Sequence, residues 1–292
     1  MAVKNLTTVL KSSKKEVEIC RDKGVTVIGE RINPTGRKKL QAELEAGKFD
    51  ILRRDAKSQL AAGAEILDVN AGLPGADEPS LLVEMIKEVQ AATDDAIICI
   101  DTSSSKALEA ALSFYCKNHA KPLVNSVNAH PSSLKEVLPL IKQYEVAVVG
   151  LCSGEDAIPK SAEARLRNAE RIIEEAERLG IPREDILIDP LVLTLGSEWE
   201  AAKLVLEAIF MIVDKFGVNI TMGASNVSFG LPDRESLTSY FLAMSVLAGL
   251  SCPICNPLKK QDMIALKAAD LIMARDPYGL KWIEAFRSRQ GG

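Results

Sequence analysis

Short apolar runs rich in Val and Ile alternate along the chain with longer stretches whose apolar residues recur at helical spacing. The short runs predict β-strands and the longer stretches predict helices, because apolar positions repeat about every two residues on a strand and about every 3.6 on a helix. From Val25 onward, eight such pairs follow one another. The predicted strands begin at Val25, Glu65, Ala96, Pro122, Val146, Asp185, Ile220 and Ser251.

The clearest helix prediction covers residues 161–179, which end directly before Gly180. A glycine at the end of a helix and a proline shortly after it, here Pro182, are typical stop signals. One face of the predicted helix is charged and the other is apolar, as expected for a helix that covers a core. The apolar stripe consists of Ala164, Leu166, Ala169, Ile172, Ile173 and Ala176.

Regular alternation of strand and helix predicts a parallel sheet, and continuously apolar strands predict burial on both faces. Eight units after Val25 fit a closed (β/α)8 TIM barrel, whose usual size is about 250 residues. An open sheet would call for a glycine-rich phosphate loop after its first strand. The first strand instead leads into GERINPTGRKK, which contains neither GxGxxG nor GxxxxGK[ST]. We therefore expect an α/β protein of the barrel type.

The organisation that follows is one barrel over residues 25–292 with an N-terminal extension over residues 1–24. We expect the extension to form a helix that closes the bottom of the barrel or packs on its flank. No stretch of the sequence has the composition of a linker between two domains.

Composition excludes several classes of partner. The 36 Lys and Arg residues stand against 40 Asp and Glu, for a net charge of −4, so there is no basic field for nucleic acid. The longest apolar stretch, Phe241 to Cys255, is interrupted by Ser, Gly and Pro and is shorter than the roughly 20 residues of a membrane span. The N-terminus lacks the apolar core of a signal peptide. We expect a cytoplasmic protein.

Neither the cysteines nor the histidines predict a metal site. Several of the six cysteines lie inside apolar runs, where a thiol behaves as a small hydrophobic group. Cys252 and Cys255 have the spacing of a redox or metal motif but stand without a second pair or a nearby histidine, so core packing is favoured. His119 and His130 form no HxH pair and are interpreted as surface residues. The run DILIDPL lacks a lysine for imine chemistry.

Polar side chains gather where the predicted strands end. In a barrel of this type these ends form the mouth that carries the active site, although Asp, Asn and Ser are also common in turns and helix caps. Paired carboxylates and amides suit a flat, neutral heterocycle with an N–C–N edge, such as a pterin or a purine. The residues concerned are Asp68, Asn70, Asp101, Thr102, Asn125, Asn128, Asp189, Ser225, Asn226 and Ser228.

Six segments stand in order at these strand ends, namely GERIN (29–33), LDVNAG (67–72), IDTS (100–103), NSVNA (125–129), IDPL (188–191) and SNVSFG (225–230). Together they resemble the pterin-binding methyltransferases that move a methyl group between methyltetrahydrofolate and a corrinoid protein. The resemblance covers nearly the whole chain from Val25. The fold and some motifs are shared with the folate domain of methionine synthase and with dihydropteroate synthase, so the resemblance implies a dihydropteroate synthase-like barrel.

The resemblance also implies roles for individual residues. Asp101, Asn125 and Asp189 would contact the pterin ring, and Asn226 would be the catalytic residue near N5, the nitrogen that holds the methyl group. Gly223 and Ser225 would shape the backbone there. Arg234 would order this region or the ligand, the alternative being an ordinary surface arginine. A supporting position around these residues is expected for Glu30, Asn33, Asp68, Asn70, Asn128 and Ser228.

The same resemblance implies two partners. The corrinoid (cobalamin) motif DxHxxG is absent around both histidines, so a separate corrinoid protein would bring the cobalt to the barrel mouth. Family barrels are commonly homodimers, and FLAMSVLAGL (241–250) could supply apolar contact surface, although core packing explains it equally well. Within the family we favour the type that forms methyltetrahydrofolate during glycine betaine demethylation.

Two alternatives stay open. A dihydropteroate synthase must handle a pyrophosphate leaving group, yet the first loop here is NPTGRKK and the last strand, SCPICNPLKK, lacks that family's paired Arg and His. A folate-binding barrel without catalysis is the other alternative. The joint presence of Asn226, Asp101 and Asp189 favours an enzyme over it.

Overall fold

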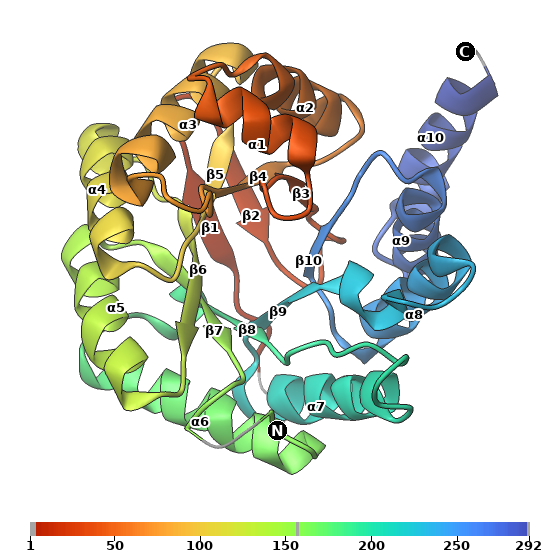
Figure 1. Cartoon of the computed structure of the whole chain (residues 1–292). Helices are drawn as coiled ribbons and strands as arrows, with labels where there is room; N and C mark the ends of the chain where they lie inside the picture. Colours follow the sequence, from red (N-terminus) through yellow and green to blue (C-terminus); the bar gives the residue numbers. More distant parts are fainter. Residues whose placement is uncertain (1–3, 156–157, 291–292) are drawn as a thin grey trace.

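The computed structural model describes residues 4–155 and 158–290. Within these ranges eight parallel strands close into a barrel in the order β10-β3-β4-β5-β6-β7-β8-β9, with helices around the outside (Figure 1). Each predicted strand run overlaps one barrel strand, so the (β/α)8 expectation is confirmed. The barrel strands are β3 (Ile28–Ile32), β4 (Ile66–Asn70), β5 (Ile97–Asp101), β6 (Leu123–Asn128), β7 (Ala147–Leu151), β8 (Ile186–Asp189), β9 (Asn219–Gly223) and β10 (Cys252–Cys255).

Helices connect successive strands and cover the outer face of the barrel. They are α1 (Lys38–Glu45), α2 (Asp50–Ala61), α3 (Glu78–Thr93), α4 (Ser105–Tyr115), α5 (Pro131–Tyr144), α6 (Ala162–Arg178), α7 (Ala201–Phe216), α8 (Arg234–Ala248), α9 (Lys260–Ile272) and α10 (Leu280–Gln290). Short 3-10 segments are η1 (Cys116–Asn118), η2 (Arg183–Asp185), η3 (Ala224–Ser228) and η4 (Pro277–Gly279).

Helix α6 confirms the clearest helix prediction. The Ser161 side chain accepts a hydrogen bond from the Ala164 N–H (3.1 Å), and Gly180 follows the helix with φ +76°. The predicted stripe lacks two buried residues in its first turn, although its half-buried Leu166 does pack against the core. Ala162 and Arg165 are buried there, whereas Ala164 and Leu166 are half-buried. The stripe was drawn through apolar residues alone, and the helix phase places an arginine in line with Ala169 and Ile172.

Two apolar cores lie on the two faces of the barrel sheet. One fills the space between strands and helices, and the other fills the lower interior of the barrel. The strands therefore consist mostly of buried apolar side chains, as in Ile97–Ile100, and many of their polar residues lie toward the carboxyl ends. Interior side chains include Ile28, Ile66, Ile97, Cys99, Leu123, Val149, Leu187 and Cys252.

The N-terminal extension forms an antiparallel hairpin of β1 (Thr8–Lys11) and β2 (Glu16–Ile19), so the expected helix is wrong. Alternate residues of the hairpin face the barrel: Leu10 and Ile19 are fully buried and belong to the same cluster as the interior side chains. An alternating pattern of this kind fits a strand and not a helix. Figure 1 shows the hairpin, in red, across the interior of the barrel.

Hydrogen bonds tie the hairpin to the amino ends of the barrel strands. The Asn219 amide, at the start of β9, donates to the Ile19 carbonyl (2.8 Å) and to Thr8 Oγ1 (3.1 Å). Lys11 and Lys121 exchange backbone hydrogen bonds of 2.9 and 2.8 Å. Residues 1–3 of the extension and 291–292 of the predicted barrel range lie outside the described residues. Among the described residues, no helix has the length and apolar character to cross a membrane.

Candidate active site

The polar residues predicted to form a site lie at the carboxyl ends of the barrel strands or directly after them. Asn70, Asp101, Asn128, Asp189 and Gly223 end their strands, and Glu30, Asp68 and Asn125 lie two or three residues before a strand end. Asn33 follows β3, Ser225, Asn226 and Ser228 lie in η3, and Arg234 begins α8. Parallel strands in a closed barrel bring these ends to one mouth. Some of these side chains, however, form hydrogen bonds within their own turns.

Two carboxyl groups on neighbouring strands, Asp68 and Asp101, share hydrogen bonds with two amides. The Asn125 amide donates to Asp68 Oδ1 (3.3 Å), and the Asn70 amide donates to Asp101 Oδ2 (3.0 Å). Burial raises the pKa of Asp68 well above its usual range, and the nearby Asp101 carboxyl raises it further. Burial also raises the pKa of Asp101. Burial thus disfavours the charged form of both carboxyl groups, and Asp101, half-buried at the mouth, is the member that a ligand can reach.

Asp189 ends β8 and is the acceptor of two backbone N–H groups. The Leu191 N–H donates to its Oδ1 at 2.8 Å, and the Gly223 N–H also bonds to this carboxyl. Burial raises the pKa of Asp189 to about 7, although both backbone donors act in the opposite direction. A ligand that brings further N–H donors stabilises the ionised form of this carboxyl group, and that stabilisation favours binding of the ligand.

Asn226 lies in η3, immediately after β9, and its side chain is exposed at the mouth. Gly223 gives the amide room: a Cβ at position 223 would lie only 3.2 Å from Asn226 Nδ2. The absence of a side chain at Gly223 therefore lets Asn226 fold back beside the strand end next to Asp189. An exposed amide that is both donor and acceptor is available to a bound ligand there.

Arg234 is exposed but is bound to the segment that carries Asn226. Its Nη2 donates to the Ser225 carbonyl (3.0 Å) and its Nε to Ser228 Oγ (3.3 Å). Its guanidinium also lies 5.5 Å from the centre of the Phe229 ring. The buried Ser228 hydroxyl bonds in turn to Thr238 of α8 (2.8 Å). These contacts hold η3 against α8.

Glu30 reaches the same segment from β3. The Ser225 hydroxyl donates to Glu30 Oε1 at 3.2 Å, and burial raises the pKa of Glu30. Asn33 and Asn128, by contrast, serve local turns. Asn33 Oδ1 accepts from the Thr35 N–H and Asn128 Oδ1 from the His130 N–H, both at 2.9 Å. The structure therefore joins Glu30 to the site by a contact but gives these two asparagines turn-forming bonds.

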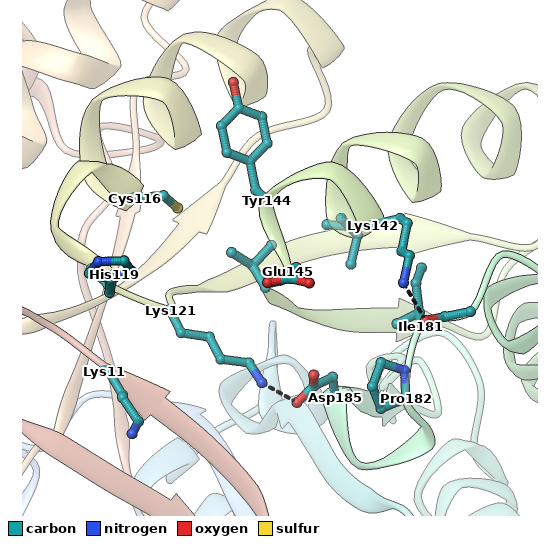
Figure 2. Close-up of a pocket in the computed structure, with 14 residues that line it drawn as sticks. Lys11, Cys116, His119, Lys121, Lys142, Tyr144, Glu145, Ile181, Pro182 and Asp185 are labelled. Atoms are coloured by element: carbon teal, nitrogen blue, oxygen red, sulfur yellow. Dashed lines mark hydrogen bonds and ion pairs between the residues drawn. The ribbon is translucent and has the colours of Figure 1, made fainter.

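A cavity of about 590 Å³ lies at the opposite end of the barrel and contains none of the predicted site residues. Figure 2 shows its lining, which includes His119, Lys11 of β1, Lys121 just before β6 and Lys142 of α5. Lys121 pairs with Asp185 (2.6 Å), and Lys142 donates to the Gly180 carbonyl (2.9 Å). Two of the lysines that line this cavity are therefore already paired within the protein. The mouth at the other end of the barrel is the candidate active site.

Cys252 and Cys255 are both buried in β10, and burial raises the pKa of each thiol, in line with the packing interpretation. His119 and His130 are exposed, as expected. In the described part of the chain, no three His, Cys, Asp or Glu side chains gather in an arrangement that could hold a metal ion.

One residue beside the site was missed by sequence reasoning. Arg165 of α6 is fully buried, and its Nε donates to the carbonyl of Pro190, which directly follows Asp189. A signal was present in the sequence, because Arg165 stands four and seven residues before Ala169 and Ile172 of the apolar stripe. An arginine at such a position indicates a specific polar contact inside the core.

The carboxyl and amide groups at this mouth are of the kind that pair with adjacent N–H donors of a flat ring. Comparison with known proteins adds a family. The family described as "Pterin binding enzyme" matches residues 29–256. The chain therefore belongs to the pterin-binding enzymes, which confirms the expected family and the prediction of an enzyme.

Among individual proteins, the chain is similar to the methylcorrinoid:tetrahydrofolate methyltransferase of Eubacterium limosum, with 30% identity over 275 residues, or 91% of this chain and 97% of that protein. It is 28% identical over 256 residues to the methionine synthase of Mycobacterium tuberculosis, covering 83% of this chain but 21% of that protein.

Solved structures of dihydropteroate synthases share the fold. One from Yersinia pestis with a pterine-sulfa conjugate superposes with a TM-score of 0.68 at 15% identity, over 91% of this chain and 99% of that one. One from Clostridium difficile in the presence of pteroic acid has a TM-score of 0.66 at 20% identity, over 86% and 97%. At these identities the likeness shows the barrel fold.

Proposed function

We propose that this enzyme transfers a methyl group between a methylated corrinoid protein and N5 of tetrahydrofolate. The observation that carries the proposal is the exposed Asn226 amide beside Gly223 and Asp189, at the mouth of a pterin-binding barrel. The similarity to a methylcorrinoid:tetrahydrofolate methyltransferase along 91% of the chain supports it.

In this proposal Asp101, Asn125 and Asp189 bind the pterin ring. The ring presents N–H groups next to one another, and a carboxylate accepts two such bonds in parallel. Asp189 is suited to this because two backbone N–H groups already orient it. Asn125 contributes an amide that can donate and accept along the ring edge. Asp68 holds Asn125 in place by accepting a hydrogen bond from it, and Asn70 holds Asp101 by donating one to it.

Asn226 acts at N5. When bound to its own protein, the corrinoid supplies a methyl group on cobalt and keeps the electron pair as the cobalt–carbon bond breaks. N5 gains the methyl group in this direction and its proton passes to solvent, while the Asn226 oxygen accepts a hydrogen bond from the N5–H as the amine attacks. In the reverse direction N5 becomes a leaving group, and the Asn226 N–H donates to it. Arg234 keeps η3, and with it Asn226, at the mouth.

The corrinoid protein docks on the exposed rim beside Asn226. Trp199 is 81% exposed and Phe229 is 65% exposed, and large aromatic side chains are typical anchors of protein interfaces. Their two loops are joined, since Thr194 Oγ1 donates to the Phe229 carbonyl at 2.6 Å. This rim lies where a cobalt atom has to approach N5.

We favour formation of methyltetrahydrofolate as the physiological direction, in keeping with the activity for which the Eubacterium limosum relative is named. Glycine betaine as the source of the methyl group and the cytoplasm as the location stay predictions. Dihydropteroate synthase is the weaker alternative, because those structures are 15–20% identical whereas the methyltransferase relative is 30% identical.

A second copy of the chain is the proposed partner at a different surface. A mostly apolar hollow of about 320 Å³ lies between α7 and α8, and Phe210, Tyr240 and Met244 on its walls are 52%, 72% and 56% exposed. Lys203 and Glu207 on α7 pair with each other at 3.7 Å, so the surface carries both charges and is compatible with a two-fold contact.

The direct test mixes the purified protein with methylcob(III)alamin and tetrahydrofolate without oxygen and follows the cobalamin spectrum. We expect loss of the methylcobalamin spectrum and formation of methyltetrahydrofolate, with no change when tetrahydrofolate is omitted. Methyltetrahydrofolate mixed with cob(I)alamin tests the reverse. Absence of any spectral change in both directions would contradict the proposal.

A further inference from the structure

Arg165 is a fully buried arginine for which the barrel core provides no acid. Its side chain is 0% exposed, yet its hydrogen bonds go to backbone carbonyls, and no carboxylate of the described residues forms an ion pair with it. Burying a guanidinium without a counter-charge costs several kcal/mol, and an apolar side chain in this place would avoid that cost. The reason for an arginine at this position therefore has to lie in the hydrogen bonds that it makes.

Those contacts are backbone carbonyls at two neighbouring loops of the mouth. Nε donates to the Pro190 carbonyl at 2.8 Å, and Nη1 donates to the Ser161 carbonyl, at the start of α6, at 3.2 Å. Among the residues that the structure describes, Nη2 has no hydrogen-bond partner. Arg165 thus joins the first turn of α6 to the loop that leaves β8.

The Pro190 carbonyl and the Leu191 N–H belong to the same peptide group, which is planar and points them in opposite directions. Arg165 binds the carbonyl end of this plane, and the N–H end donates to Asp189 Oδ1 at 2.8 Å. Leu191 has φ +65°, a conformation that is unfavourable for a residue with a side chain. The bond to Arg165 offsets this cost by holding the plane in that orientation.

We propose that Arg165 is a positioning residue for pterin binding: by fixing the Pro190–Leu191 peptide, it directs an N–H at Asp189 and so orients that carboxylate toward the ring. The inference rests on the proposed function, in which Asp189 contacts the pterin. Arg165 itself touches neither the ligand nor the reacting atoms.

The test is the dissociation constant of tetrahydrofolate for Arg165→Met, measured by anaerobic calorimetry at a temperature where circular dichroism shows a folded protein. Loss of a hydrogen bond from a charged group predicts an increase of about tenfold or more. Arg165→Lys keeps the charge and one donor, and we expect an intermediate value, about threefold or more above the parent.

Two matched variants separate positioning from general effects. Arg171→Met removes an exposed arginine of the same helix, which contacts Glu155, and Ile172→Val shortens a fully buried side chain there. Both should bind tetrahydrofolate like the parent, whatever their thermal stability. Parent-like binding by folded Arg165→Met would overturn the inference, and so would parent-like binding by Arg165→Lys if the Met variant does not fold. If the parent itself does not bind tetrahydrofolate, the proposed function fails instead.

Discussion

Asp189 concentrates several opposing effects in one side chain. Burial favours its protonated form, two backbone N–H groups favour its ionised form, and its pKa lies at about 7 as a result. At neutral pH this carboxyl group is therefore only partly ionised in the free enzyme. A pterin that donates further hydrogen bonds relieves this condition, so the binding free energy of the ligand contains a contribution from Asp189 that depends on pH.

We predict that tetrahydrofolate binding weakens as the pH falls below about 7. The ligand requires the ionised carboxylate, so below the pKa of the free enzyme a proton has to leave before binding, and the dissociation constant should rise about tenfold per pH unit. Above pH 7 it should stay level. Titrations from pH 5.5 to 8.5 measure this, with Asp189→Asn as the variant that should lose the inflection. A flat profile for the parent enzyme would contradict the prediction.

Replacing Asn226 by Ala should separate binding from methyl transfer. The variant loses the amide at N5 but keeps Asp101 and Asp189, so we expect tetrahydrofolate to bind several-fold more weakly and the rate of methyl transfer to fall about 100-fold or more. Single-turnover kinetics with methylcobalamin measure the rate, and calorimetry measures the binding. Unchanged turnover would remove Asn226 from the mechanism.

For single residues, the sequence predicts which side chains lie near the mouth better than it predicts their hydrogen-bond partners. Carboxylates and amides at strand ends are visible in the sequence, and Asp68, Asp101 and Asn125 do lie in one hydrogen-bonded group. Asn33 and Asn128 look the same in the sequence, yet each caps its own turn. Which of two nearby N–H groups an amide accepts depends on backbone direction, which residue type alone does not determine.

Among elements, the hairpin β1–β2 differs most from expectation. The barrel strands can be predicted from the sequence because they are buried on both faces and so appear as continuous apolar runs. Each hairpin strand has four residues, only some of them apolar, and Lys11 and Glu16 face solvent. Such short segments predict neither strand nor helix clearly. Their strand structure depends on contact with the barrel interior.

Shortening a buried side chain of the hairpin should destabilise the whole barrel without affecting the mouth. Ile19→Ala removes a fully buried side chain from the lower interior core, and we expect the free energy of unfolding to fall by about 2–4 kcal/mol. Val9→Ala, on the half-buried face of β1, should cost less than about 1 kcal/mol. Denaturant titration measures both. A changed dissociation constant for tetrahydrofolate in the folded Ile19→Ala variant would contradict this assignment.

On the scale of the whole molecule, the apolar surface between α7 and α8 should decide the oligomeric state. If two copies meet there, Tyr240→Glu buries a charge in the contact and should produce monomers, while the parent sediments as a dimer. Tyr278→Glu is the matched control, since Tyr278 is 94% exposed in η4 and lies outside this hollow. Analytical ultracentrifugation measures the state. A monomeric parent, or a dimeric Tyr240→Glu, would contradict the proposal.

The bonds of Asn219 also bear on how the protein is made. They join β9 to Ile19, 200 positions earlier, and to Thr8, 211 positions earlier. A ribosome releases the hairpin first, and its partner Lys121 follows early, but Asn219 emerges only after six of the barrel strands have been synthesised. Leu10 and Ile19 therefore have no complete binding place during most of translation. Any truncated product that stops before β9 therefore lacks the Asn219 bonds to Thr8 and Ile19, and we expect its hairpin to be more open to proteolysis than in the full chain.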